Sequence, residues 1–364
     1  MNVLLLSYGD LDYDGRLRSL LSLFSKIGTV FSYTRGGKPL GTNGIVCNLP
    51  YMAFIRKSIG YARKLPNIDV LVLDNRKATI PGMIIKQIIN PHYTILDCRE
   101  LYLIDEVKHF TGKAGCIFEK KMAKKADIVI CANEERAEIM HQVYNLSKRP
   151  LSFENIRKLE YSSEDNIERI EKKFKEYIHE DEIRIISSSG CSIDRTNDVL
   201  VRNLVKVKQK CRLFLVGCSD SKEKQTILEI AAKDKVKNIT ILGQLNQAEL
   251  KYLISQCHIG IVNYGQYDTN NKYCASGKLY EFLYEGIPVV TTTNPPLKKI
   301  CETARIGIAD DSYYNGINQV LEEYDIFKNH VKEFTDIHTI EKNEEDICKK
   351  IMKEISTRKM ACNE

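Results

Sequence analysis

The feature that most constrains the fold is an alternation of short aliphatic or β-branched runs with longer amphipathic stretches, which occurs twice along the chain. Each short run suits a strand buried on both faces, and each longer stretch suits a crossover helix, which is the pattern of a parallel sheet. A charged stretch with helical spacing and no strand signal separates the two series (162–181). The expected strands are 3–6, 29–33, 69–74, 93–97 and 127–132 in the first series, and 183–188, 212–217, 238–243, 259–264, 287–292 and 306–309 in the second.

This pattern predicts an α/β protein with two Rossmann-like, doubly wound domains that face each other across a cleft, followed by a helical C-terminal extension. The predicted N-terminal domain spans 1–160, a charged helical hinge spans 161–182, and the C-terminal domain spans 183–335. Residues 336–364 are expected to form a helix that packs back on the N-terminal domain. Ligands of open α/β sheets bind beyond the carboxyl ends of the strands, so functional residues are expected in the loops that follow strands.

Composition and charge narrow the class of protein. With 364 residues, 43% of them hydrophobic, the chain can bury the cores of two domains, which excludes a disordered protein. The net charge of +6 is unevenly spread, because residues 1–150 carry 22 basic and 14 acidic side chains whereas the remainder carries 32 and 34. This excess favours an acidic partner or an anionic surface for the first half. Nucleic acid is not expected, because no nucleic-acid-binding motif accompanies the charge.

The sequence also bears on location and cofactors. No apolar run approaches the ~18 residues of a membrane-spanning helix, and residues 1–7 lack the leader and long apolar core of a signal peptide. We therefore expect a cytoplasmic protein that can also lie peripherally at the inner membrane face. The 12 cysteines show no Cys-x-x-Cys pair and no spacing for a tetrahedral metal site. They are expected to be reduced thiols, nearly all buried, and no metal or other cofactor is predicted.

One basic stretch could contact a membrane. Residues 51–64 (YMAFIRKSIGYARK) place Met52, Ile55, Ile59 and Ala62 at helical spacing beside four cations. Such a helix can lie on an anionic bilayer. It can equally pack its apolar face on the sheet and leave the cations in water, and this second interpretation is favoured.

The most informative segment is SGKLYEFLYEGIPVV, residues 276–290. Ser276 and Gly277 open a predicted helix whose first backbone N–H groups are free to bind an anion, and Lys278 adds a full charge. Glu281, one turn further on, can accept two hydrogen bonds from a vicinal diol such as that of a ribose. The alternative is an ordinary amphipathic helix with a solvated lysine and glutamate.

A second loop, GCSIDRTND (190–198), follows the first strand of the second series. Gly190 permits close backbone approach, and Arg195 can clamp a diphosphate with two parallel hydrogen bonds. A surface turn with a salt-bridged arginine explains this loop equally well.

These segments resemble the donor-nucleotide region of GT-B-fold glycosyltransferases, in particular glycosyltransferase family 4. The family pattern Pro/Ser-x-Lys-Leu-x-Glu-Tyr-x-x-x-Gly-x-Pro-Val-Val is similar to residues 276–290. The resemblance implies that Glu281 binds the nucleotide ribose, that the helix start lies against the diphosphate, and that Arg195 neutralises the leaving phosphate. The donor-binding residues it implies are Glu281, Lys278, Gly277, Ser276, Arg195, Gly190, Gly243, Tyr264, Asn271 and Tyr273.

Two positions depart from the family pattern. Tyr273 stands where retaining members often carry a second glutamate, eight positions before Glu281, so the donor sugar and the stereochemistry stay open. In LDCREL (96–101), Arg99 replaces a histidine that points into the active site of relatives. Arginine cannot act as a general base at neutral pH, but it can contact a phosphate or an acidic sugar.

The first half holds one further motif, GDLDYDGR (9–16). Its Asp-x-Asp could hold a divalent ion, but we discount this interpretation because the donor signals lie in the second half. Asp14-Gly15-Arg16 resembles the Asp-x-Arg with which family-4-like chains open their first helix near the acceptor. The expected acceptor side therefore consists of Asp14, Arg16, Arg99 and Glu100. The alternative is that Asp14 is a helix N-cap and Arg16 lies on the exposed face.

The resemblance implies a metal-independent glycosyltransferase of polysaccharide biosynthesis. It would move a sugar from a nucleotide diphosphate sugar, with UDP favoured, to a glycan or lipid-linked glycan acceptor. Arg195 and Lys278 would stabilise the leaving diphosphate, and Arg99 and Asp14 are further candidate catalytic residues. A retaining mechanism suits the lack of an evident general base, whereas inversion would need a carboxylate such as Asp14 or Glu100. Two alternatives stay open, a UDP-sugar 2-epimerase-like enzyme and a catalytically silent GT-B-like subunit that binds glycans.

Overall fold

The computed structural model describes residues 1–39 and 43–361 and divides into two units. Unit 1 consists of Met1–Asn155 together with the C-terminal segment that begins at Ile340. Unit 2 consists of Ile156–Thr339, so the segment 161–182 lies within it. The arrangement of the units around a common cleft stays a prediction.

Within the described residues, unit 1 is built on a seven-stranded parallel sheet with the order β3-β2-β1-β4-β5-β6-β7. Its strands are β1 (Asn2–Ser7), β2 (Thr29–Thr34), β3 (Gly44–Val46), β4 (Val70–Asp74), β5 (Tyr93–Cys98), β6 (Ile128–Cys131) and β7 (Leu151–Ser152). Its helices are α1 (Gly15–Ser25), α2 (Tyr51–Ala62), α3 (Thr79–Ile89), α4 (Phe110–Ala123), α5 (Glu134–Tyr144) and α15 (Ile340–Ala361), with a 3-10 helix, η1 (Arg76–Ala78).

Helices cover both faces of this sheet, because side chains along each strand point alternately to opposite sides. On β1, Leu4 and Leu6 join a core formed with α2, α3, α4 and α5. Val3 and Leu5 join a second core formed with α1 and α15. These two cores confirm the predicted doubly wound class for unit 1.

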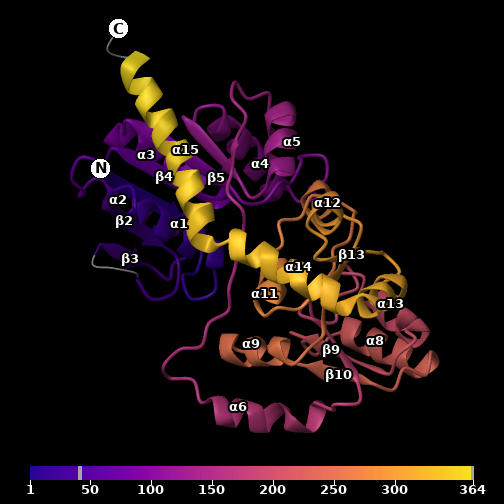
Figure 1. Ribbon diagram of the computed structural model, residues 1–364. Coiled ribbons are helices and arrows are strands. Elements are labelled where there is room, and N and C mark those ends of the chain that lie inside the picture. Colours follow the sequence, from indigo (N-terminus) through magenta and orange to yellow (C-terminus); the bar gives the residue numbers. More distant parts are fainter. Residues whose placement is uncertain (40–42, 362–364) are drawn as a thin grey trace. The chain divides into compact units, whose positions relative to one another are not determined.

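The last helix, α15, belongs to unit 1. Ile347, Ile351 and Ile355 recur every four residues, which places them on one helix face, and they are buried in the core that contains α1. The Tyr93 hydroxyl donates a hydrogen bond to the Ile355 carbonyl (3.0 Å). Figure 1 shows α15 in yellow beside α1.

Unit 2, whose residues are all described, holds a six-stranded parallel sheet with the order β10-β9-β8-β11-β12-β13. Its strands are β8 (Ile183–Ser187), β9 (Cys211–Val216), β10 (Ile239–Leu242), β11 (Ile259–Val262), β12 (Val289–Thr291) and β13 (Gly307–Ala309). Its helices are α6 (Ile167–Phe174), α7 (Asn197–Asn203), α8 (Lys222–Lys233), α9 (Gln247–Ser255), α10 (Thr269–Lys272), α11 (Gly277–Tyr284), α12 (Pro295–Ala304), α13 (Tyr314–Glu322) and α14 (Tyr324–Ile337), with 3-10 helices η2 (Lys175–Tyr177) and η3 (Leu204–Lys206).

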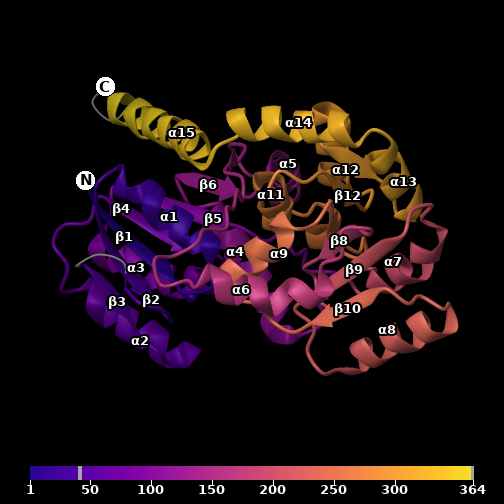
Figure 2. The ribbon, with the colours of Figure 1, turned by 60° about the horizontal axis from the view of Figure 1, so that its bottom comes forward.

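The charged segment before β8 is anchored on unit 2. Its helix α6 lies beside α9, as Figure 2 shows, and Phe174 stacks on Tyr252 with 6.1 Å between the ring centroids. Ile170 and Phe174 are the buried residues of α6. The many charges of this helix therefore surround a narrow apolar stripe.

All eleven expected strands are present at the predicted places in the described residues, with ends that differ by a residue or two. The sequence did not predict β3 and β7, which have three and two residues. Strands this short carry too few residues to show an alternation pattern.

The basic helix α2 packs on the sheet, as favoured, through a face that only partly matches the expected one, because Ala62 is buried and Ile59 packs against the core but Met52 does not. Its buried residues are Phe54, Ser58 and Ala62, whereas Met52 is 75% exposed. The aromatic ring of Phe54 decides the orientation, because it packs against Tyr8 and Tyr33 in the core. No helix among the described residues is both long and apolar enough to cross a membrane.

Candidate functional site

Helix α11 begins where the sequence predicts. Ser276 is the N-cap, and its hydroxyl accepts a hydrogen bond from the backbone N–H of Leu279 (3.4 Å). Gly277 is the first helical residue and is buried. The N–H groups of a first helical turn have no intrahelical acceptor, so this end of α11 suits an anion.

Glu281 lies one turn into α11 and is 7% exposed. Burial raises the pKa of the Glu281 carboxyl, and the charges of Arg157 and then of Lys278 oppose this rise. Arg157 Nη1 lies 3.7 Å from Glu281 Oε1. The predicted ribose ligand is therefore a buried carboxyl group flanked by cations.

Lys278 lies near Glu281 and Arg157. Its pKa is lowered to about 8, first by burial and then by repulsion from Arg195 and from Arg157, against the attraction of Glu281. A bound anion would favour the charged ammonium and reverse this shift. The surroundings of Lys278 thus suit a negatively charged ligand.

Arg195 lies in the loop after β8 and is close enough to Lys278 to repel its charge. Its guanidinium lies over the ring of Tyr264, with 4.0 Å from Cζ to the ring centroid. Arg195 Nη1 is buried and has no hydrogen-bond partner among the described residues. Buried donors on a cation are normally satisfied, and an anionic ligand would do so here.

A buried amide network holds the loop that carries Arg195. Asn197 Nδ2 donates to the carbonyl oxygens of Gly190 (3.0 Å) and Ser192 (3.2 Å). Asn197 Oδ1 accepts from Asn263 Nδ2 (2.8 Å) at the end of β11. The loop therefore has a defined shape before any ligand binds.

Two glycines allow this loop to approach the loop after β9. Gly190 has φ +69°, and a Cβ there would lie 2.9 Å from the Gly217 carbonyl oxygen. Gly217 N donates to the Gly243 carbonyl oxygen (3.1 Å), which places Gly243 next to these loops.

The expectation of reduced thiols is wrong for one pair, because Cys191 and Cys218 form a disulfide between the loops that follow β8 and β9. Their Cα atoms lie 5.2 Å apart, a separation that a disulfide can span. The pairing could not be predicted from the sequence, in which the two cysteines are 27 residues apart.

Asn271, in the segment before α11, has its polar groups satisfied within unit 2. Asn271 donates from its backbone N (2.7 Å) and from Nδ2 (2.9 Å) to Asp268 Oδ1, and its carbonyl accepts from Asn294 Nδ2 (2.9 Å). Tyr273 is half-buried and is the C-cap of α10. Donor contacts by Asn271, Tyr273, Tyr264 and Gly243 stay predictions.

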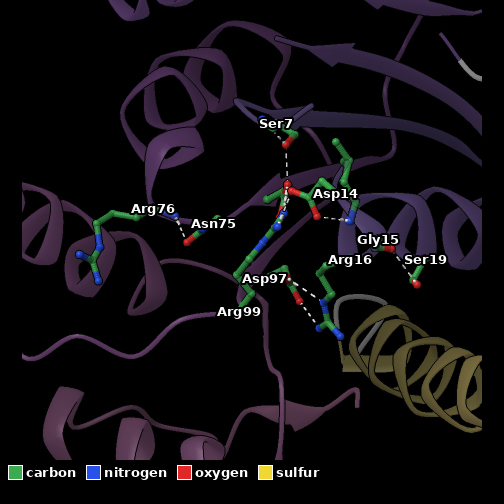
Figure 3. A network of polar contacts seen from close by, with 12 residues as sticks. Ser7, Asp14, Gly15, Arg16, Ser19, Asn75, Arg76, Asp97 and Arg99 are labelled. Carbon is green, nitrogen blue, oxygen red and sulfur yellow. Dashed lines mark hydrogen bonds and ion pairs between the residues drawn. The ribbon is translucent and has the colours of Figure 1, made fainter. Parts of the chain in front are cut away.

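In unit 1, three of the four expected acceptor residues, Asp14, Arg16 and Arg99, make polar contacts that Figure 3 shows. Arg99 Nη1 donates to Asp14 Oδ2 (2.5 Å), and Arg99 Nη2 donates to both carboxylate oxygens of Asp74. Burial raises the pKa of Asp74, and Arg99 opposes the rise. Asp14 Oδ1 accepts from the backbone N–H of Leu17 (3.1 Å), so the N-cap interpretation of Asp14 is confirmed.

Arg16 is 4% exposed, so the alternative that placed it on an exposed helix face is wrong. It pairs with Asp97, donates to the Phe153 carbonyl oxygen (2.6 Å), and lies over the Phe153 ring at 4.4 Å. Helix α1 packs this face against the carboxyl end of β5, where Asp97 supplies the charge that a buried arginine needs. Glu100 is half-buried, and its contact with an acceptor stays a prediction.

Sequence reasoning missed Asp74, Asp97 and Arg157. The two aspartates had a usable signal, because each ends or nearly ends a predicted strand at the functional edge of the sheet. Arg157 had none, since 124 residues separate it from Glu281 and no motif surrounds it. Among residues 1–39 and 43–361, no group of three or more His, Cys, Asp or Glu is arranged to hold a metal ion.

Comparisons with known proteins address the fold. No protein-family model matches the chain, and no curated protein sequence matches it. Anabaena HepE in complex with UDP and glucose matches with a TM-score of 0.75 at 14% identity, over 97% of this chain and 100% of that chain. The chain has the GT-B fold.

Two further solved structures share this fold. A sucrose-phosphate synthase from Thermosynechococcus elongatus matches with a TM-score of 0.73 at 15% identity, over 98% of this chain and 100% of that chain. The UDP-GlcNAc 2-epimerase of Neisseria meningitidis bound to UDP-GlcNAc matches with a TM-score of 0.58 at 12% identity, over 97% and 100%. The GT-B fold, with two parallel-sheet α/β units and a C-terminal helical segment, is therefore confirmed.

Proposed function

We propose that this GT-B protein is a glycosyltransferase that transfers a sugar from a UDP-sugar to a hydroxyl group of a glycan or lipid-linked glycan. One observation carries the proposal. At the start of α11, a buried carboxyl group, Glu281, lies beside the cations Arg157 and Lys278, and Arg195 in turn repels the charge of Lys278. A carboxylate for a ribose diol beside cations for a diphosphate is the chemistry that a nucleotide sugar requires.

The solved structures support the same donor. HepE was obtained with UDP-glucose as well as with UDP and glucose, and each match spans nearly the whole of this chain. The Neisseria epimerase was obtained with UDP-GlcNAc. Because bound UDP-sugars recur among these neighbours, we favour UDP over other nucleotides.

In the proposed reaction, the bond between the sugar and the diphosphate breaks while the acceptor oxygen bonds to the same carbon. Lys278, Arg195 and the first N–H groups of α11 would stabilise the charge that develops on the leaving diphosphate. These groups would supply the stabilisation without a metal ion. We favour retention, with a leaving phosphate oxygen taking the acceptor proton, because both oxygens of Asp14 already accept hydrogen bonds from Leu17 and Arg99.

The acceptor would bring the protein to a membrane surface if it is lipid-linked. Helix α2 presents exposed Arg56 and Lys57 beside exposed Met52, and exposed Arg63 and Lys64 follow directly after the helix. Cations that flank an exposed apolar side chain suit the surface of an anionic bilayer. We therefore propose peripheral contact with the inner face of the membrane through α2.

The experiment that tests the donor site is a calorimetric titration of UDP into wild-type protein and into Glu281→Ala and Glu281→Gln variants. A hydrogen bond to a charged group contributes about 1.5–3 kcal/mol, so we expect the affinity of the Ala variant for UDP to fall about ten- to a hundredfold. Glu229→Ala, an exposed change on α8, is the matched control and should bind UDP as the wild type does. Unchanged affinity in both Glu281 variants would contradict the proposed role of this carboxylate.

The fold match to the Neisseria enzyme favours a 2-epimerase as the second candidate function. The two functions differ in what they need, because an epimerase converts a UDP-sugar without any acceptor. Incubation with UDP-GlcNAc alone, followed by NMR of the sugar, separates them. We expect UDP release that depends on an acceptor, and conversion of UDP-GlcNAc to an epimer would establish the second candidate instead.

A further inference from the structure

Arg157 lies across the start of α11, although it comes from the segment that opens unit 2, before α6. Its aliphatic stem lies against Gly277, where an added Cβ would collide with Arg157 Cδ and approach its Cγ to 3.1 Å and its Nε to 3.2 Å. Its guanidinium lies 3.7 Å from Glu281 Oε1. Arg157 thus lies between the start of α11, where the diphosphate of the proposed donor would bind, and Glu281, where its ribose would bind.

The charges explain why Arg157 pairs with Glu281 in the free protein. Burial disfavours the ionised carboxylate of Glu281, and Arg157 is the larger of the two charges that oppose this effect. Arg157 in turn contributes to the lowered pKa of Lys278. A single guanidinium therefore acts on Glu281 and on Lys278, two of the residues that the sequence singled out for donor binding.

The geometry of the pair is that of a replaceable contact. A direct charge-assisted hydrogen bond would be about 2.7–2.9 Å long, and the observed separation is 3.7 Å. The Arg157 side chain is 36% exposed, whereas the Glu281 side chain is 9% exposed. The arginine can therefore move while the glutamate stays in place.

We propose that Arg157 exchanges partners when the donor binds, leaving Glu281 to the ribose diol and pairing with the diphosphate. This inference rests on the proposed function and adds to it a third cation for the diphosphate and a competitor for the ribose ligand. A guanidinium is suited to both tasks, because its planar fork pairs with carboxylates and with phosphates. Arg157 then makes the site select nucleoside diphosphates over nucleosides.

The exchange predicts opposite effects on two ligands. In Arg157→Ala, UDP loses one cation, and we expect its affinity to fall at least tenfold. Uridine has no phosphate and gains a Glu281 freed from its competitor, so its affinity should stay equal or rise. Arg157→Lys keeps the charge but not the two parallel donors and should fall between wild type and Arg157→Ala for UDP.

The test measures the affinities of UDP by calorimetry and of uridine by ligand-observed NMR in wild type, Arg157→Ala and Arg157→Lys. Arg169→Ala, at an exposed arginine on α6, is the matched control.

Each outcome has a meaning. A parallel loss of uridine and UDP affinity would overturn the exchange, since it would show that Arg157 merely supports α11. If wild type binds UDP and Arg157→Ala binds it equally well, the inference fails and the proposed function stands. If wild type binds no UDP at all, the proposed donor site and the inference both fail.

Discussion

Lys278 shows how one residue can combine binding with a pH dependence. Its pKa is lowered to about 8 because it is buried and because Arg195 and Arg157 repel its charge, while Glu281 attracts it. In the free protein Lys278 is therefore charged below about pH 8 and neutral above it. A diphosphate favours the charged form, so ligand binding and protonation of Lys278 should be linked.

We expect the affinity for UDP to fall as the pH rises above about 8, by up to tenfold per pH unit, until the raised pKa of Lys278 in the complex is reached. Calorimetric titrations at several values between about pH 7 and 9.5 measure this slope. Lys278→Arg keeps its charge across this range and should give a nearly constant affinity. An equally steep slope in that variant would show that another group is responsible.

The residues at the start of α11 could be predicted to lie close together from their spacing in the sequence. Ser276, Lys278 and Glu281 lie within six residues of one another, and helix geometry alone brings them to one helix end. Their local arrangement could be predicted because it depends on spacing and not on tertiary packing. Asp14 was open to two interpretations, and the N-cap that the structure shows follows from an equally local pattern.

At the scale of elements, the loop after β8 is held by Asn197 and by the Cys191–Cys218 disulfide. A cross-link between residues 27 apart stabilises by restricting the unfolded chain, by about 3–4 kcal/mol in the chain-entropy estimate. The disulfide therefore supports the backbone that places Arg195.

We expect reduction with dithiothreitol, or the double change Cys191→Ala with Cys218→Ala, to lower the melting temperature of the protein. Differential scanning calorimetry measures the change, and Cys47→Ala, at a half-buried free thiol, is the control. Thiol titration of the unreduced, denatured protein should find two thiols fewer than after reduction. An equal number before and after reduction would refute the disulfide.

Among the elements, the long central strands could be predicted from the sequence, but the short edge strands β3 and β7 could not. Long buried runs such as those of β1 and β5 announce themselves, because burial on both faces requires continuous apolar residues. The buried face of α2 was predicted only in part, because Phe54 and Met52 fit the helical period equally well and only the aromatic contacts with Tyr8 and Tyr33 select Phe54.

In the whole molecule, the excess positive charge of residues 1–150 lies in unit 1, which includes the exposed cations of α2. Each cation near an anionic bilayer contributes about 1 kcal/mol, so a few residues decide whether the protein stays bound.

We expect the protein to co-sediment with vesicles that contain phosphatidylglycerol and not with vesicles of phosphatidylcholine alone. The double change Arg56→Glu with Lys57→Glu should release it, whereas Lys172→Glu with Lys175→Glu, at exposed positions of unit 2, should leave binding unchanged. Equal binding by both double variants would remove α2 from the membrane contact.

The amino-acid sequence was sufficient to predict the two series of parallel strands, the capped start of α11, and the positions of Lys278 and Glu281. These follow from periodicity and from spacings of a few residues, which the backbone converts directly into geometry. Three pairings could not be predicted in this way: Arg157 with Glu281, Arg99 with Asp14 and Asp74, and Cys191 with Cys218. These partners are 25 to 124 residues apart, and packing of the sheet and its loops, not local chain geometry, brings their charges and sulfur atoms together.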